Sequence, residues 1–204
     1  MTKGKLFVIS GPSGTGKGTI CSEILDQRPS IRMSVSMTTR TPRNGEIDKI
    51  HYHFTDHDSF RNLIEADGFL EYANVYGNFS GTPRKQVMEW LDEGIDVILE
   101  IDVQGAMQVR NSYPDAVLIF ILPPSLEELR NRIAGRGSET EETMKKRLGA
   151  ALNEISQVGE YDYSVVNDDI DIAVDKVKSI IVSEQCRVDC ENVELTVDKY
   201  KEEL

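Results

Sequence analysis

Four short runs of apolar residues interrupt an otherwise polar chain, and each predicts a buried strand. They lie at residues 6–10, 97–101, 117–122 and 164–166. Within these runs Val, Ile and Leu follow one another without regular polar alternation, which is typical of a parallel sheet covered on both faces. We therefore expect the four runs to form one buried parallel sheet.

The segments between these runs have helical periodicity. Helices are predicted at residues 19–27, 83–92, 125–133 and 141–158. Ile20 and Ile24 are four residues apart in the first helix, and in the third Ser125 is a candidate N-cap with Glu128 three residues later. The alternation of strands and helices predicts an α/β, doubly wound domain.

Two stretches do not fit this alternation. Residues 36–82 are rich in Thr, Asn, Gly, His and aromatic residues, with a short alternating piece at 50–54, and they predict a small mixed insertion. Residues 134–146 place two glycines around Arg136 in a polar segment, which predicts a mobile loop.

Composition and charge narrow the class of protein. The 204 residues are 39% hydrophobic, and no apolar run reaches the length of a membrane span or of a signal peptide's central segment. Three cysteines give no disulfide framework and indicate a reducing compartment, so we expect a cytoplasmic protein. A net charge of −12 argues against a broad nucleic-acid or membrane surface.

Basic residues nevertheless gather in one part of this acidic chain. The cluster consists of Arg130, Arg132, Arg136, Lys145, Lys146 and Arg147. It is compatible with a small anionic ligand and also with a solvated helix face, and charge alone does not separate the two.

A glycine-rich motif follows the first predicted strand and opens the first predicted helix. It reads Gly11, Pro12, Ser13, Gly14, Thr15, Gly16 and Lys17, which fits the first part of a P-loop. Glycines allow the backbone N–H groups to surround phosphate oxygens, the helix N-terminus adds positive potential, and Lys17 adds a compact charge. The motif predicts binding of a nucleotide's phosphates.

One position departs from the usual P-loop. Gly18 stands where a Ser or Thr hydroxyl normally ligates Mg²⁺, and Thr19 follows it. We expect Mg²⁺ to enter with ATP, held by phosphates and water rather than by a firm protein ligand. Glu100 is the candidate exception, because it and Asp102 are two apart in a predicted strand and should face the same side.

A second anion site is predicted in the insertion. Arg40 and Arg43 flank Pro42 on a segment that is not helical, and Tyr52 follows nine residues later. Two guanidiniums and a phenol hydroxyl suit a second phosphate group, although two surface arginines remain the plainer interpretation.

These motifs together resemble the signature of the guanylate kinase family. The signature residues in the insertion are Ser36, Thr39, Arg40, Arg43, Glu46, Tyr52, His53 and Phe54. Further matches follow in order at residues 69–71, 77–82, 101–105, 123–125, 132–137 and 166–169, so the resemblance covers nearly the whole chain. It implies a P-loop NTPase core of three layers with a parallel sheet, a mixed α/β GMP-binding insertion and a small lid.

The resemblance also implies domain limits and roles for single residues. The limits are core at 1–35, GMP-binding insertion at 36–88, core at 89–130, lid at 131–148, and core with a C-terminal tail at 149–204. ATP would be held by residues 11–19 and Asn167, and GMP by Ser36, Arg40, Arg43, Tyr52, Glu71, Thr82 and Asp102. The lid arginines facing the transferred phosphoryl group would be Arg132, Arg136 and Arg147.

Base recognition follows from hydrogen-bonding chemistry once these positions are assigned. Guanine presents N1–H and an amino group, which suit a carboxylate such as Glu71, while Ser36 and Thr82 could donate to O6. GMP, and dGMP with it, is then the expected acceptor. A kinase for AMP or a ribosyl phosphate, and a phosphopeptide-binding module that has lost activity, remain as alternatives.

Three positions depart from the family pattern. Ser80 stands where many members have a second phosphate-binding tyrosine, Lys49 replaces a glycine, and Glu100 replaces an aspartate. The first of these removes one contact to the GMP phosphate, and together they could raise the KM for GMP.

Overall fold

The structure is a computed structural model of the chain, and it describes residues 3–75, 77–135, 140–188 and 190–203. Its core is a five-stranded parallel sheet in the order β2-β7-β1-β8-β9. The strands are β1 (Leu6–Ser10), β2 (Arg32–Met33), β7 (Val97–Glu100), β8 (Val117–Leu122) and β9 (Tyr163–Val166). All four apolar runs are strands of this one sheet, as the sequence predicts.

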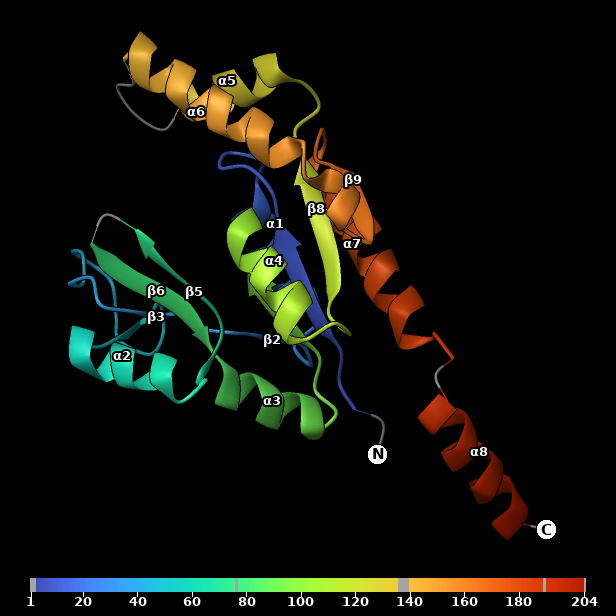
Figure 1. The fold of residues 1–204 in the computed structure, drawn as a ribbon. Helices are drawn as coiled ribbons and strands as arrows, with labels where there is room; N and C mark the ends of the chain where they lie inside the picture. Colours follow the sequence, from blue (N-terminus) through green and yellow to red (C-terminus); the bar gives the residue numbers. More distant parts are fainter. Residues whose placement is uncertain (1–2, 76, 136–139, 189, 204) are drawn as a thin grey trace.

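Helices cover both faces of this sheet, because alternate residues of each buried strand point to opposite sides. Phe7 and Ile9 pack against α1 (Lys17–Gln27) and α7 (Ile170–Gln185). Leu6 and Val8 pack on the other face against α3 (Arg84–Asp92) and α4 (Val103–Ser112). The predicted three-layer α/β core is confirmed, and Figure 1 shows the helices on its two sides.

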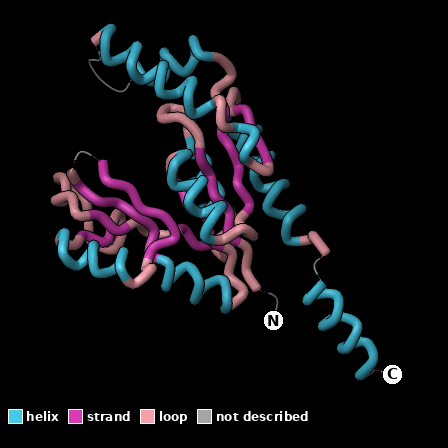
Figure 2. The backbone as a smooth tube through the Cα atoms, in the orientation of Figure 1, coloured by secondary structure: helices cyan, strands magenta, loops and turns pink. Residues whose placement is uncertain are grey.

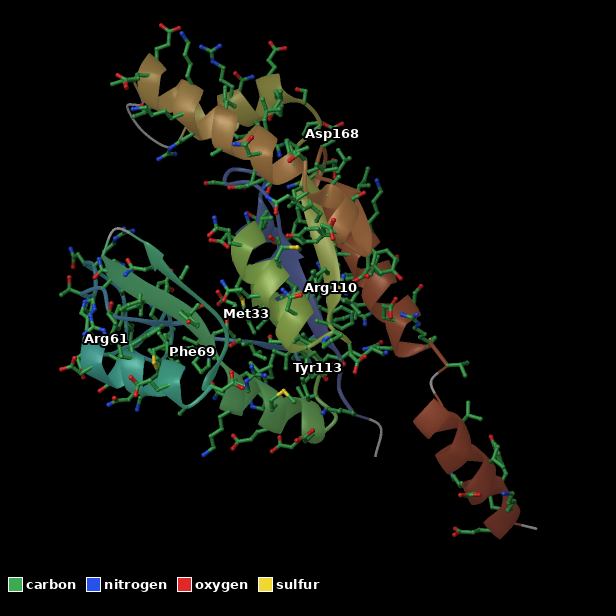
Figure 3. The ribbon with its side chains drawn as sticks, in the orientation of Figure 1. Met33, Arg61, Phe69, Arg110, Tyr113 and Asp168 are labelled. Atoms are coloured by element: carbon green, nitrogen blue, oxygen red, sulfur yellow. The ribbon has the colours of Figure 1, made fainter. Side chains whose placement is uncertain are left out.

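A second sheet lies beside the core and is built from the predicted insertion. Its order is β4-β3-β6-β5, with strands β3 (Met37–Thr38), β4 (His53–Phe54), β5 (Phe69–Val75) and β6 (Asn78–Pro83). Helix α2 (His57–Glu65) packs against it through Phe60, which stacks between Phe69 and Phe79. Figure 3 labels Phe69 and Arg61 in this part of the molecule.

A pair of helices stands above the carboxyl edge of the core sheet (Figure 1). They are α5 (Leu126–Ala134) and α6 (Glu141–Ile155), and they share a small apolar cluster that includes Leu129 and Met144. A short 3-10 helix, η1 (Val158–Glu160), leads from α6 toward β9. Figure 2 shows this helical pair as separate from the strands of both sheets.

The last helix, α8 (Cys190–Glu202), projects away from the core (Figure 1). This helix occupies the end of the segment expected as a C-terminal tail. None of the helices in the described part of the chain combines the length and apolar character that spanning a bilayer requires.

Several predicted limits were wrong. The helix predicted at 141–158 ends at Ile155, and the alternating piece at 50–54 forms a strand only at His53–Phe54. Residues 141–146 of the predicted loop are helical, because Thr140 caps α6 by accepting the N–H of Thr143. The strand predicted at 97–101 ends at Glu100.

The domain limits remain a prediction, and three of them fall inside helices: the limit at residue 88 in α3, the one at 130 in α5 and the one at 148 in α6. The boundary at residue 88 divides α3, whose Val87 and Leu91 pack in the core cluster with Leu6 and Val8.

Candidate functional site

The predicted phosphate loop connects β1 to α1 at the carboxyl edge of the core sheet. Gly16 is the N-cap of α1 with a φ of 89°, a conformation that side chains disfavour. No side chain caps α1, so the N–H groups of its first turn are available to an external anion. The loop therefore offers the backbone donors that a phosphate group requires.

Lys17 lies folded over this loop. Its Nζ donates to the carbonyl oxygen of Gly11 at 2.6 Å and to that of Pro12 at 3.0 Å. Burial lowers the pKa of the Lys17 ammonium, and the nearby carboxylates of Glu100 and Glu154 oppose that change. The lysine is thus a partly buried cation at the loop, near acidic groups.

Glu100 and Asp102 do not lie in one strand, so the prediction of two carboxylates on the same strand was wrong. Because β7 ends at Glu100, Asp102 lies beyond the strand and is the N-cap of α4, where its Oδ1 accepts the N–H of Gly105 at 2.8 Å. Glu100 is the residue beside the phosphate loop: a Cβ on Gly18 would lie 3.5 Å from both of its carboxylate oxygens.

The oxygen atoms near Gly18 determine how well this part of the site suits a metal ion. Glu100 supplies carboxylate oxygens, which Mg²⁺ prefers, while the usual hydroxyl is absent at Gly18. The described residues contain no cluster of three or more His, Cys, Asp or Glu side chains that could hold a metal by themselves. The site thus fits a metal ion that arrives with a phosphate ligand.

Asn167 lies directly behind the phosphate loop. Its side chain is buried, and Nδ2 donates to the carbonyl oxygen of Thr15 at 2.8 Å. A Cβ on Gly16 would lie 2.4 Å from that same Nδ2, so the loop and the amide are in close contact. The family resemblance places Asn167 near adenine, and that role stays a prediction. The structure adds a loop-supporting role that sequence reasoning missed.

The predicted lid arginines fall on the helical pair and the segment between them. Arg132 on α5 donates from Nε to Oε1 of Glu128 at 2.8 Å and from Nη1 to the carbonyl oxygen of Asn167 at 2.9 Å. This bond connects α5 to the residue that supports the phosphate loop. Arg147 is exposed on α6, and Arg136 lies outside the described residues.

Glu46 organises the predicted second phosphate site. Its carboxylate accepts hydrogen bonds from both terminal nitrogens of Arg40 at 2.9 Å and from the backbone N–H of Arg43 at 2.7 Å. These bonds lower the pKa of Glu46 to about 2, and the bond from the Arg40 side chain contributes most. The Arg40 guanidinium also lies 5.3 Å from the ring centre of Tyr52. The structure thus brings together Arg40 and Tyr52, and Arg43 through its backbone.

Glu71 and Thr82 form a buried polar pair in the second sheet. They are cross-strand neighbours on β5 and β6, and the Thr82 hydroxyl donates to Oε1 of Glu71 at 2.7 Å. Ser36 directly precedes β3, whose Met37 pairs with Gly81 of β6. Of the three residues predicted to read a base, two therefore come from adjacent strands and the third precedes the next strand of the same sheet.

The environment of Glu71 is unusual for a carboxyl group. Burial raises its pKa to about 7, with Asp102 adding to the rise and Thr82 opposing it. Because the Thr82 hydroxyl gives its one proton to Glu71, it has none left to donate elsewhere in this arrangement. Thr82 here positions the carboxylate, and Ser36 remains the predicted donor to O6.

Known proteins resemble this chain over most of its length. The family model for guanylate kinase matches residues 3–184. A guanylate kinase from Clostridium tetani is 56% identical over 189 residues, covering 93% of this chain and 90% of that protein. One from Clostridioides difficile is 49% identical over 202 residues, covering 99% of this chain and 98% of that protein.

A solved structure agrees with these sequence matches. The crystal structure of guanylate kinase from Anaplasma phagocytophilum has a TM-score of 0.74 and 36% identity, covering 92% of this chain and 89% of that chain. The stretch matched by the family model contains the phosphate loop, Arg40, Glu71 and Asn167. The chain belongs to the guanylate kinase family.

Proposed function

We propose that this guanylate kinase transfers the γ-phosphoryl group of ATP to GMP by holding one nucleotide on the phosphate loop and the other against the second sheet. The observation that carries the assignment of residues is the buried pair of Glu71 and Thr82. An ionised carboxylate only accepts hydrogen bonds, which suits the N1–H and amino group of guanine. Adenine presents an acceptor at N1, which cannot donate a hydrogen bond to the Glu71 carboxylate.

The phosphate of GMP, which accepts the transferred group, is assigned to the site around Glu46. Arg40, Arg43 and Tyr52 would hold the phosphate of GMP, with Arg40 already oriented by Glu46. That phosphate is mostly dianionic at neutral pH because its second pKa is near 6. It needs no general base, so catalysis rests on position and on charge neutralisation.

Cations from two parts of the structure are assigned to neutralise the charge of the transferred phosphoryl group. Lys17 would leave the carbonyl oxygens of its own loop and contact the phosphates of ATP. Arg132, Arg136 and Arg147 would approach from the lid. Asp102 would lie near guanine, since it already neighbours Glu71.

Magnesium is proposed as the cofactor that accompanies ATP. It neutralises phosphate charge when bound. Glu100 would contribute to holding it beside Gly18, and phosphate oxygens and water would complete its shell. We also propose dGMP as a second acceptor, because the assigned residues contact base and phosphate rather than sugar. The cytoplasm is the proposed location, where both nucleotides occur.

An ADP-release assay tests the proposal. The purified chain would be given Mg-ATP with GMP, dGMP, AMP, UMP or CMP in turn. Stimulation by GMP and dGMP is expected. Stimulation by AMP instead would overturn the role of Glu71, and ATP binding without stimulation by any acceptor would overturn the transferase assignment.

A further inference from the structure

Gly105 lies against the carboxylate that is proposed to read guanine. It is a buried residue in the first turn of α4. A Cβ built on it would lie 2.8 Å from Oε2 of Glu71, 3.2 Å from Cδ and 3.4 Å from Cγ. Real Cβ atoms essentially never make contacts below 3.0 Å, so a side chain at this position would require the Glu71 carboxylate to shift.

Glu71 has little freedom to move away. Its Oε1 accepts the Thr82 hydroxyl at 2.7 Å, and its backbone is paired with β6. A carboxylate pushed from Gly105 would therefore lose the Thr82 bond or turn Oε2 away from its present position. The location of the second oxygen thus depends on what stands at position 105.

The backbone of Gly105 does not itself require glycine. The residue is helical, and it is absent from the positions with positive φ. Its N–H donates to Oδ1 of Asp102, a bond that any residue other than proline can make. Alanine is the better helix former, so local propensity disfavours the glycine that is present. The contact with Glu71 is therefore a reason for glycine at this position that helix propensity does not provide.

We propose that Gly105 is a specificity-determining position: its missing side chain leaves the space in which Glu71 presents two oxygens to guanine. Gly105 is a positioning residue, because it acts through Glu71. This inference rests on the proposed function and adds a prediction about which feature of the base is read. Guanine offers two neighbouring donors, N1–H and the 2-amino group, whereas hypoxanthine lacks the amino group.

GMP and IMP are therefore the informative pair of acceptors. With both oxygens in place, GMP should be favoured over IMP, because IMP lacks one of the two neighbouring donors that the Glu71 carboxylate can accept. In Gly105→Ala the displaced carboxylate should lose much of this preference. We expect kcat/KM for GMP to fall by about tenfold or more, and the ratio of GMP to IMP to fall by about the same factor.

A matched control is available within the chain. Gly149 lies in the middle of α6, and a Cβ built on it would meet nothing within 4 Å. Gly149→Ala therefore makes the same chemical change in a helix without a contact. Both variants would be measured with GMP and IMP, with the KM for ATP and the thermal midpoint as further readouts.

The outcomes separate this inference from its alternatives. Loss of GMP preference in Gly105→Ala, with an unchanged KM for ATP and an unchanged Gly149→Ala, supports it. An unchanged ratio of GMP to IMP overturns it while leaving the proposed function intact. Absence of GMP stimulation in the unsubstituted chain would overturn the proposed function first, and with it this inference.

A double variant covers the case in which Gly105→Ala does not fold. Glu71→Asp shortens the side chain by one methylene and withdraws the carboxylate from position 105. Recovery of folding in Gly105→Ala with Glu71→Asp supports the proposed contact. A double variant as unstable as Gly105→Ala alone overturns it, because the disturbance then lies elsewhere.

Discussion

Asn167 donates from Nδ2 to the carbonyl oxygen of Thr15 at 2.8 Å, which ties the end of β9 to the phosphate loop across 152 residues of sequence. The carbonyl oxygen of the same asparagine accepts Nη1 of Arg132 at 2.9 Å. One buried residue thus connects the core sheet, the phosphate loop and helix α5. The position of α5 and the shape of the loop are therefore linked through it.

Asn167→Ala should weaken ATP binding. It leaves the buried carbonyl oxygen of Thr15 without its donor, at a cost of about 1–3 kcal/mol in stability. We expect the Kd for ATP, measured by calorimetry, to rise by about tenfold, while the KM for GMP changes less. Asn153→Ala, at an exposed position of α6, is the control. Equal losses for both nucleotides would argue against a specific effect on the loop.

Glu46→Gln should raise the KM for GMP more than it changes kcat. The substitution removes the charged partner that orients Arg40. The binding of GMP must then immobilise the Arg40 side chain as well. Ordering one long side chain costs about 0.5–1.5 kcal/mol, which corresponds to about two- to tenfold in KM. Glu65→Gln, at an exposed position of α2, should leave both constants unchanged. A fall in kcat alone would contradict the positioning role.

Protonation of Glu71 should reduce guanine recognition below neutral pH. Its pKa is raised to about 7 by burial, with Asp102 as the neighbouring charge, and only the ionised form accepts from both guanine donors. We expect kcat/KM for GMP to fall as pH drops from 8 to 6, approaching tenfold per unit below about 7. Glu71→Gln should have a lower value that is flat from pH 8 to 6.5. A flat profile in the unsubstituted chain would contradict the prediction.

The same pKa has a consequence for stability with a definite sign. The folded protein holds this proton more tightly than the unfolded chain, because the folded pKa lies above the ordinary value of 4.5. Glu71 should therefore contribute stability as pH falls from about 7 toward 4.5, and should destabilise the fold above 7. Comparing thermal midpoints of Glu71→Gln and the unsubstituted chain across this window measures the contribution.

Phe60→Ala should disturb the second sheet and leave the core in place. Phe60 is fully buried, with ring centres 4.3 Å from Phe69 and 5.3 Å from Phe79. Removing such a ring costs about 3–5 kcal/mol. We expect GMP stimulation to be lost while ATP binding persists, because the phosphate loop belongs to the other sheet. Ile50→Ala, at an exposed position, is the control, and loss of ATP binding in Phe60→Ala would show that the two sheets fold as one unit.

Local patterns in the sequence predicted the core well. The strands are continuous apolar runs because both faces of a covered parallel sheet are buried, so each strand is recognisable without its neighbours. The cap at Ser125 was also readable, and its Oγ accepts the N–H of Glu128. The reciprocal bond of a capping box, from the Ser125 N–H to the Glu128 carboxylate, is not formed, because that carboxylate binds Arg132 instead. Helix α6 begins at Glu141 as predicted, after its cap at Thr140, and only its end was misjudged, because it stops at Ile155 rather than at residue 158.

The sequence by itself determined the phosphate loop, the alternation of strands and helices, and the family, because these depend on residue spacing along the chain. Only the tertiary structure decided how the site residues meet. Thr82 gives its proton to Glu71, Asn167 supports Thr15, and Gly105 leaves room for a carboxylate because strands and helices distant in sequence pack together. Such contacts depend on strand pairing and helix position, which no local pattern contains.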